Sequence, residues 1–248
     1  MKERQNRILD ALTKHEKLEV KELAEMMEVS QVTIRKDLDA LTKQGLIIRN
    51  HGYATLNNSD DMNNRLAYHY EMKQRIAKKV CEDIHDGETI MIESGSCCAL
   101  VALEIAQSKK NITIITNSAF IADYIRNEEV KVILLGGEYQ ASSQVLVGPI
   151  TINNAKNFFV DKYFIGADGF SEKSGFTGKD YLRAETVREM AKQATQVIVV
   201  TESEKFGHIG TVNLLDTNNV AKVYTDTHIP EEDEVYLNEM NVEVIKVD

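Results

Sequence analysis

Two polar clusters in the second half of the chain have the composition of a phosphate-binding loop. Ser94-Gly95-Ser96 and Thr116-Asn117-Ser118 each follow a short apolar run and each precede a helical pattern. Such loops offer backbone N–H groups, hydroxyls and the positive end of a helix, which together suit a phosphate. Carboxylates for sugar hydroxyls are available at Glu93, Asp168 and Glu185, and a cation at Lys205. A phosphorylated sugar is the ligand that uses all these groups at once.

Each of these residues also has a plain structural interpretation. Ser94-Gly95-Ser96 taken alone is more often a helix cap, and Gly136-Gly137 is more often a turn. Glu185 and Arg188 are three residues apart and can form an exposed ion pair on one helix. We favour the binding interpretation for the set as a whole because the polar clusters share one position, the carboxyl end of a predicted strand.

The predicted elements bring these clusters to one edge of a sheet. Short β-rich runs alternate with helical stretches, which predicts βαβ units and a mostly parallel sheet. The polar clusters lie at the carboxyl ends of the strands, where open α/β sheets bind ligands. The predicted strands are 89–92, 112–115, 130–135, 162–165, 197–200, 220–224 and 242–247.

A different chemistry is indicated by residues 29–41. Read as a helix, this stretch places Ile34, Leu38 and Leu41 on one stripe. Ser30 occupies the N-cap position. A short helix over 20–27 and a tight turn precede it, and this combination is typical of a helix-turn-helix.

The flanking residues predict a winged form of this motif. We expect a helix over 2–15, an extended piece at 18–20, and two strands at 46–49 and 53–56 around a turn at Asn50-His51-Gly52. A second long helix is predicted over 65–85, after a polar linker.

A recognition helix presents its first turns to base edges in the major groove. Polar donors there pair with guanine or adenine, and wing residues reach the backbone or the minor groove. The alternatives are a solvated face on which Arg35 and Lys36 pair locally with Asp37 or Asp39, and a simple turn role for His51. The residues predicted to contact DNA are Ser30, Gln31, Val32, Thr33, Arg35, Lys36, Arg49 and His51.

Composition limits the classes of function. The chain has 248 residues, of which 43% are hydrophobic, and a net charge of −10. Residues 1–56 carry +1 and the remainder −11, so an architectural protein that coats nucleic acid is disfavoured. No apolar run is long enough for a bilayer, and the first residues do not resemble a signal peptide, so we expect a cytoplasmic protein without a membrane partner.

The three cysteines suit a reducing compartment. Cys81, Cys97 and Cys98 are odd in number, and no cysteine–histidine spacing indicates a metal site. Cys97-Cys98 is either a thiol sensor or, as we favour, a pair of small buried side chains at a helix start.

The first part of the chain resembles the amino-terminal domain of the DeoR family of bacterial sugar-responsive transcription regulators. Residues 21–24, 29–30, 33–38 and 49–54 read Lys-Glu-Leu-Ala, Val-Ser, Thr-Ile-Arg-Lys-Asp-Leu and Arg-Asn-His-Gly-Tyr-Ala. Residues 93–96, 116–118, 135–137, 148–150, 166–177 and 203–207 are similar to the sensor domain of the same family. That domain is similar in fold to ribose-5-phosphate isomerase and coenzyme A transferases.

The resemblance implies an α+β winged helix-turn-helix head followed by an α/β sensor domain with a mostly parallel sheet. We place the head at 1–57, a linker at 58–64 and the sensor at 65–248. The chain departs from the family pattern at Glu93, Cys97, Arg188, Glu202 and Glu204, which bears on which sugar fits. The positions that match the family's expected pocket are Ser94, Gly95, Ser96, Thr116, Asn117, Gly136, Gly137, Asp168, Gly169, Glu185 and Lys205.

Two functions follow as hypotheses. The first is a transcription regulator, a repressor of a carbohydrate uptake or catabolic operon, relieved by a phosphorylated sugar or sugar derivative. It has no cofactor besides this effector, and it acts as a homodimer or homotetramer on double-stranded operator DNA. The alternative is a sugar-phosphate isomerase with a DNA-binding head, in which Lys205 and a carboxylate would transfer protons.

Overall fold

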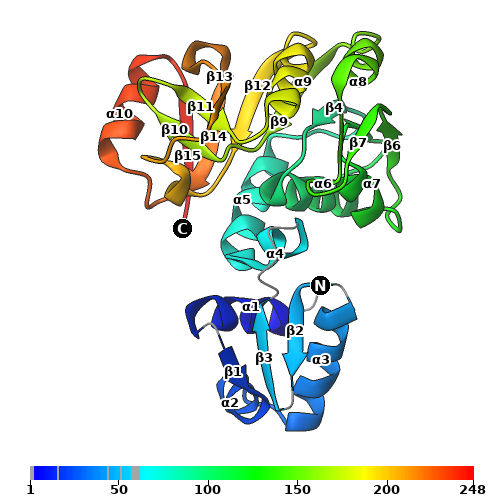
Figure 1. Cartoon of the computed structure of the whole chain (residues 1–248), viewed down its shortest axis with the longest axis vertical. Coiled ribbons are helices and arrows are strands. Elements are labelled where there is room, and N and C mark those ends of the chain that lie inside the picture. The colour runs from blue at the N-terminus through cyan, green and yellow to red at the C-terminus, as the bar shows by residue number, and fades with distance from the viewer. Residues whose placement is uncertain (1–2, 16, 44, 51, 57–61) are drawn as a thin grey trace. The chain divides into compact units, whose positions relative to one another are not determined.

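The computed structural model of the chain describes residues 3–15, 17–43, 45–50, 52–56 and 62–248. It divides into two compact units, Met1–Met72 and Lys73–Asp248, which are drawn in Figure 1. Each unit has its own sheet and its own buried side chains, so each is described by itself.

The first unit is the predicted winged helix-turn-helix. Its small antiparallel sheet has the strand order β1-β3-β2, and the β2–β3 hairpin forms the wing. The helices and strands match the predicted positions closely, and the predicted fold of this part is confirmed. The elements are α1 (Glu3–His15), β1 (Lys17–Glu19), α2 (Val20–Met26), α3 (Gln31–Lys43), β2 (Ile47–Asn50), β3 (Tyr53–Leu56) and α4 (Met62–Ala67).

The recognition helix α3 is positioned by its apolar stripe and by its cap. Ile34, Leu38 and Leu41 are all fully buried, as the 3.6-residue period predicts. The Ser30 hydroxyl accepts the Thr33 N–H at 3.2 Å, which satisfies one unpaired donor of the first turn. Gly45 follows the helix with a φ of +73°, the left-handed conformation that favours glycine.

The single helix predicted over 65–85 is wrong. The structure has two helices, α4 and α5 (Tyr70–Glu82), separated at Tyr68-His69. His69 has a φ of +47°, and a residue in the left-handed region cannot continue a right-handed helix. The last residues of the predicted linker, 62–64, already belong to α4, while 57–61 lie outside the described residues.

The second unit is built on a seven-stranded parallel sheet. Its strand order is β15-β14-β12-β9-β4-β5-β6, and every pairing in it is parallel. Figure 1 shows α5, α6 and α7 on one face of this sheet and α8 and α9 on the other. The predicted α/β architecture is confirmed. The strands are β4 (Thr89–Ile92), β5 (Thr113–Thr116), β6 (Lys131–Leu134), β9 (Val160–Ile165), β12 (Ala194–Val200), β14 (Lys222–Asp226) and β15 (Glu243–Val247).

Several elements of this unit have no counterpart among the predicted ones. They include a second, three-stranded sheet and a separate hairpin, whose strands have only three or four residues each. Runs this short carry little periodic signal. These elements are β7 (Glu138–Gln140), β8 (Val145–Val147), β10 (Gly169–Ser171), β11 (Gly175–Gly178), β13 (Val212–Leu215) and α8 (Gly148–Ala155).

The remaining helices are α6 (Ser96–Ser108), α7 (Ala119–Tyr124), α9 (Tyr181–Ala191) and α10 (Glu231–Glu239), with 3₁₀ turns at Ser203–Lys205 and Thr217–Asn219. Among the residues that the structure describes, every helix is too short or too polar to span a membrane.

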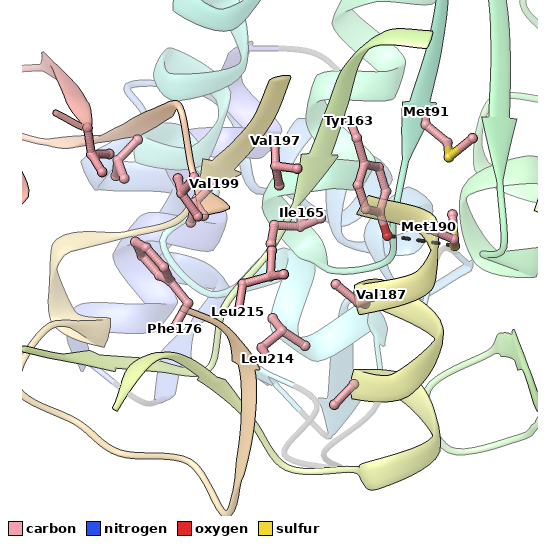
Figure 2. Close-up of a cluster of buried hydrophobic side chains, with 14 of the residues drawn as sticks. Met91, Tyr163, Ile165, Phe176, Val187, Met190, Val197, Val199, Leu214 and Leu215 are labelled. Atoms are coloured by element: carbon pink, nitrogen blue, oxygen red, sulfur yellow. Dashed lines mark hydrogen bonds between the residues drawn. The ribbon is translucent and has the colours of Figure 1, made fainter. Parts of the chain in front are cut away.

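The core of the second unit joins the large sheet to α9 and to the small sheet. Figure 2 shows Val187 and Met190 of α9 beside Tyr163 of β9, with Leu214 and Leu215 from β13 in the same cluster. The Tyr163 hydroxyl lies 3.7 Å from the Met190 sulfur. This packing fixes α9, and with it the side chains that α9 directs toward the carboxyl ends of the strands.

Candidate functional site

The first turns of α3 present an exposed mixed surface. Gln31, Arg35 and Lys36 are exposed and Thr33 is half-buried, while Val32 is 61% exposed. An exposed β-branched residue at the start of a recognition helix can contact a thymine methyl group, and the polar residues can bind base edges. This face therefore has the composition of a base-reading surface.

The nearby carboxylates are held by other partners. Asp37 is buried and accepts hydrogen bonds from Arg4 Nε at 2.6 Å and from the Gln5 side chain. Asp39 forms an ion pair with Arg49 of the wing. The alternative, local pairing of Arg35 or Lys36 with these aspartates, is not seen in the described part of the chain. Both cations remain available at the surface.

The other residues predicted to contact DNA differ in their contacts within the protein. Arg49, predicted to reach DNA, is tied to Asp39 on α3, which links the wing to the recognition helix. The hydroxyls of Ser30 and Thr33 lie 2.9 Å apart and form a hydrogen bond at the N-terminus of α3. His51 lies outside the described residues.

The second unit has a topological switch point between β4 and β9. The chain runs from β4 outward through β5 to β6, then returns to β9 on the other side of β4. At such a point the loops after two neighbouring strands diverge and leave a crevice for a ligand. Here those loops are close together: a Cβ at Gly95 would lie 4.0 Å from the Gly166 Cα.

Glu93 is a structural carboxylate at this point. Its side chain is fully buried and accepts two hydrogen bonds from Arg183 of α9, at 2.7 and 3.0 Å. The Ser94 hydroxyl donates a third at 2.8 Å. Glu93 was predicted to bind sugar hydroxyls directly. In this structure its oxygens accept hydrogen bonds from Arg183 and Ser94, so the carboxylate also has a structural role.

Arg183 was missed from the sequence. It is only 13% exposed. Burial alone would lower the pKa of its guanidinium, but the charge and hydrogen bonds of Glu93 outweigh this and raise it above the ordinary value. The Asp180 N-cap accepts the Arg183 N–H and sets the first turn of α9. No local pattern pairs residues 90 positions apart, so this contact could not be read from the sequence.

The N-terminus of α6 lacks a side-chain cap. Its N-cap is Gly95, with a φ of +119°, and glycine has no side chain with which to cap the first turn. Ser96 is half-buried at this end. The N-terminus of a helix, here one of 13 residues, favours an anion through its N–H groups and its dipole.

The Thr116-Asn117-Ser118 cluster does not repeat this arrangement, contrary to expectation. The Ser118 hydroxyl caps α7 by accepting the Ile121 N–H, and the Thr116 hydroxyl accepts the Ser118 N–H. Asn117 is fully buried and donates to the Leu146 carbonyl. Its Oδ1 atom is buried without a partner in the described residues.

The loops after β9 and β12 lie next to each other. The Gly207 N–H donates to the Phe170 carbonyl, and a Cβ at Gly169 would lie 2.3 Å from the His208 carbonyl oxygen, so only glycine fits there. Asp168 is half-buried at the end of β9. Lys205 is 32% exposed and its ammonium lies 3.1 Å from Glu204.

A buried lysine reaches the same region and was also missed. Lys73 of α5 is 1% exposed. Its ammonium lies 3.3 Å from the Ser96 hydroxyl and 3.8 Å from a Glu202 carboxylate oxygen. Ser96 follows β4 and Glu202 follows β12, the two strands that flank β9. Lys73 therefore bridges loops on both sides of the switch point.

Comparison with known proteins agrees with both halves of this description. A model of the DeoR-like helix-turn-helix domain matches residues 4–60, and one of the DeoR C-terminal sensor domain matches residues 68–227. The chain belongs to the DeoR family. It is a DNA-binding transcription regulator, as its resemblance to that family indicated.

Curated relatives align along nearly the whole chain. The glycerol-3-phosphate regulon repressor of Escherichia coli K12 is 32% identical over 92% of each chain. The L-fucose operon activator of the same organism is 28% identical over 90% of this chain and 94% of its own. Among solved structures, ribose 5-phosphate isomerase A of Methanocaldococcus jannaschii covers 55% of this chain and 54% of its own, at 18% identity and a TM-score of 0.41.

The enzyme alternative is not favoured for this DeoR-family chain, because relatives that match it over most of their length are named as regulators. The thiol-sensor interpretation is also weakened. All three cysteines are buried and unpaired in disulfides, and burial, reinforced by the charge of Glu93, raises the pKa of Cys98 well above its ordinary value.

Two other predicted parts of the DeoR-family site belong to β6 and to α9. Gly136 and Gly137 follow the edge strand β6 and pack against α8, where a Cβ at Gly137 would lie 2.0 Å from the Thr151 hydroxyl. Their turn interpretation explains this contact. Glu185 is half-buried on α9, two residues from Arg183 and so on a different helix face.

The ion pair of Glu185 with Arg188 is not seen in the described residues, since Arg188 donates to the Asn213 carbonyl. Arg188 instead lines a cleft of about 450 Å³ beside the amino-terminal ends of β12 and β14. None of the predicted effector residues lines this cleft. The start of α6 and the buried charges of Glu93 and Arg183 lie instead at the switch point.

Proposed function

We propose that this regulator represses a carbohydrate uptake or catabolic operon and releases its operator when a phosphorylated sugar or sugar derivative binds the second unit. The names of the two relatives support a carbohydrate-related operon, since they refer to glycerol 3-phosphate and L-fucose. One relative is named a repressor and the other an activator, so the sign of regulation differs between them. For this chain we propose repression.

The observation that carries the effector site is the uncapped N-terminus of α6 at the switch point. The phosphate binds the first-turn N–H groups beside the Ser96 hydroxyl, at a helix start that Gly95 leaves without a side-chain cap. Asp168 and Lys205, on the neighbouring loops, bind hydroxyl groups of the sugar. Glu93 accepts hydrogen bonds from Arg183 and from Ser94, and these bonds hold the loop that precedes α6.

The DNA-binding part of the proposal assigns base contacts to Gln31, Val32, Arg35 and Lys36. Arg35 or Lys36 binds guanine and Gln31 binds adenine, which are the pairings that side-chain geometry favours. Arg49 and His51 serve the wing. The exposure of the first four residues and the engagement of Asp37 and Asp39 elsewhere support this assignment.

We also propose the division into a head at 1–57, a linker at 58–64 and a sensor at 65–248. The two family models, which meet between residues 60 and 68, support this boundary, whereas residue contacts group 62–72 with the first unit. A two-fold operator calls for a homodimer or homotetramer. Sedimentation velocity on the 28.0 kDa chain distinguishes these states from a monomer.

A thermal-shift screen tests the effector site. We expect phosphorylated compounds, such as glycerol 3-phosphate and glucose 6-phosphate, to raise the melting temperature, and glycerol and glucose to leave it unchanged. Gly95→Ala should abolish the shift because alanine disfavours the φ of +119° that keeps the loop open. Gly87→Ala is the matched control, since Gly87 also has a positive φ and open space around it.

Both variants should lose a similar amount of stability, and only Gly95→Ala should lose the ligand response. An equal shift with phosphorylated and unphosphorylated compounds would contradict a phosphate site. A full response in Gly95→Ala would remove the α6 N-terminus from the proposal.

A further inference from the structure

The recognition helix α3 carries a carboxylate on its exposed side. Val32, Lys36 and Asp39 follow the i, i+4, i+7 spacing, so they share the helix face opposite the buried stripe. Val32 and Lys36 are exposed, and the Asp39 side chain is 60% exposed. A carboxylate on a surface that binds DNA repels the phosphates of the duplex, so its presence there needs a physical reason.

The wing brings a cation to this carboxylate. Arg49 lies opposite Ala54 in the β2–β3 hairpin, and directly opposite residues of paired strands share a face. Ala54 is fully buried, so Arg49 extends from the face of the wing that packs against the helices. Figure 1 shows β2 beside α3, and Arg49 Nη1 donates to Asp39 Oδ1. The guanidinium is thereby held at the side of the recognition helix.

The ion pair leaves most of the hydrogen-bonding capacity of this guanidinium unused. An arginine has five N–H donors in a planar fork, which matches the O6 and N7 acceptors of guanine. In the described part of the chain, Asp39 is the one side chain to which Arg49 donates, and the Arg49 side chain is 30% exposed. An arginine already oriented by a carboxylate loses less conformational freedom on binding DNA than an unrestrained one.

We propose that Arg49 binds a guanine in the major groove and that Asp39 is the residue that positions it. The inference rests on the proposed base contacts of α3 and extends the base-reading surface to the first strand of the wing. A phosphate contact would need only the charge of Arg49, whereas a guanine contact needs its fork in a fixed orientation. The ion pair with Asp39 supplies that orientation.

Two duplexes test this inference with the full chain at one salt concentration: one selected by the wild type from a random pool, and a scrambled duplex of the same length. Asp39→Ala should lower the preference for the selected duplex by about tenfold, which is within the range for one bidentate base contact. Its affinity for the scrambled duplex should be unchanged or higher, because a repulsive charge has been removed. Charge repulsion alone predicts tighter binding to the selected duplex as well.

Variants of Arg49 show whether Asp39 acts through it. Arg49→Ala should lose the same preference, and the double variant Asp39→Ala/Arg49→Ala should lose no more than Arg49→Ala alone. Arg49→Lys keeps the charge but not the fork, so it should also lose the preference, and it keeps the inference testable if Asp39→Ala fails to fold. Glu25→Ala is the matched control, because Glu25 is an exposed carboxylate of α2 that is paired with Lys21. Its preference should equal that of the wild type.

Two results overturn the inference. An unchanged preference in Asp39→Ala, with tighter binding to both duplexes, means that Asp39 is only a repulsive charge. An equal loss of affinity for both duplexes in Arg49→Ala, with a salt dependence reduced by about one phosphate, is the result expected of a backbone contact.

Arg35→Ala separates this inference from the proposed function. Loss of preference in Arg35→Ala, with none in Asp39→Ala, overturns the role of Asp39 alone. Failure of the wild type to select any duplex overturns the proposed base contacts, and the role of Asp39 with them.

Discussion

Single residues at the switch point are held by charge pairs that the low-dielectric interior makes costly to break. Glu93 accepts hydrogen bonds from Arg183 and Ser94 and has no exposed surface. Removing one partner of such a pair leaves an uncompensated buried charge, whereas removing both can be nearly neutral. The pair therefore positions the loop before α6 and gives a clear test.

Arg183→Met should lower the free energy of unfolding by about 3–5 kcal/mol, the usual loss when one member of a buried ion pair is removed. The double variant Glu93→Gln/Arg183→Met should recover much of that loss. Urea unfolding of the two variants and the wild type measures both effects. Equal destabilisation in single and double variants would mean that packing, and not charge, explains the contact.

Asp10 of the head introduces a pH dependence. Its Oδ1 accepts the Glu71 N–H at 3.4 Å, and its Oδ2 is buried without a partner in the described residues. Burial, assisted by the side-chain carboxyl of Glu71 and opposed by this N–H, raises the pKa of Asp10 to about 6. The folded chain thus keeps a proton that the unfolded chain releases near its ordinary pKa of 3.8.

This group therefore stabilises the fold fully below about pH 4, and its contribution is lost as the pH rises through about 6. Asp10→Asn keeps the neutral form at every pH. Its melting temperature should rise relative to the wild type between pH 5 and 7.5, and Glu71→Gln should reduce the same slope. Parallel pH curves for all three proteins would show that Asp10 titrates normally.

At the scale of elements, two loops of similar composition differ in their use. Ser94-Gly95-Ser96 leaves α6 without a side-chain cap because glycine occupies the N-cap. Ser118 occupies the same position before α7 and caps it with its hydroxyl. A helix end that is already satisfied by its own cap has less to offer an anion. The two loops were predicted to have the same arrangement, and in the structure they differ in this cap.

The two glycines after the edge strand β6 are also explained by tertiary packing. Gly136-Gly137 has the sequence of either a turn or a ligand-binding loop. In the fold, the Thr151 hydroxyl of α8 donates to the Gly136 carbonyl at 2.6 Å. The close approach of α8 explains the glycine at 137 without a ligand, because any side chain there would collide with Thr151.

At the scale of the whole molecule, base reading and effector binding belong to different units. We expect Arg35→Ala to weaken binding to a duplex selected by the wild type from a random pool, by about 1–3 kcal/mol. The thermal shift with a phosphorylated ligand should be unchanged. Gel retardation and thermal shift on the same preparation measure both. Lys43→Ala, in the last turn of α3, controls for loss of a positive charge.

Loss of both activities in a folded Arg35→Ala protein would contradict this division of labour. Communication between the units then requires a coupling free energy. A 100-fold change in operator affinity on effector binding corresponds to about 2.7 kcal/mol, which is within the range of known allosteric proteins. By linkage, operator DNA must weaken effector binding by the same factor.

The sequence by itself determined the winged head, the parallel sheet and the family of this protein. Hydrophobic periodicity and caps are local, so Ile34, Leu38, Leu41 and Ser30 were assigned correctly from their spacing alone. Loops at strand ends were also predictable, because a parallel sheet brings all its carboxyl ends to one edge.

Only the tertiary structure decided which polar groups meet at that edge and which are already satisfied. The contact of Glu93 with Arg183, and that of Lys73 with Glu202, join residues 90 and more than 120 positions apart. Such pairs have no sequence period, because they depend on strand order and on helix packing. This packing buries Glu93. It also places Lys73, which lies on a helix that precedes the sheet, beside the start of α6.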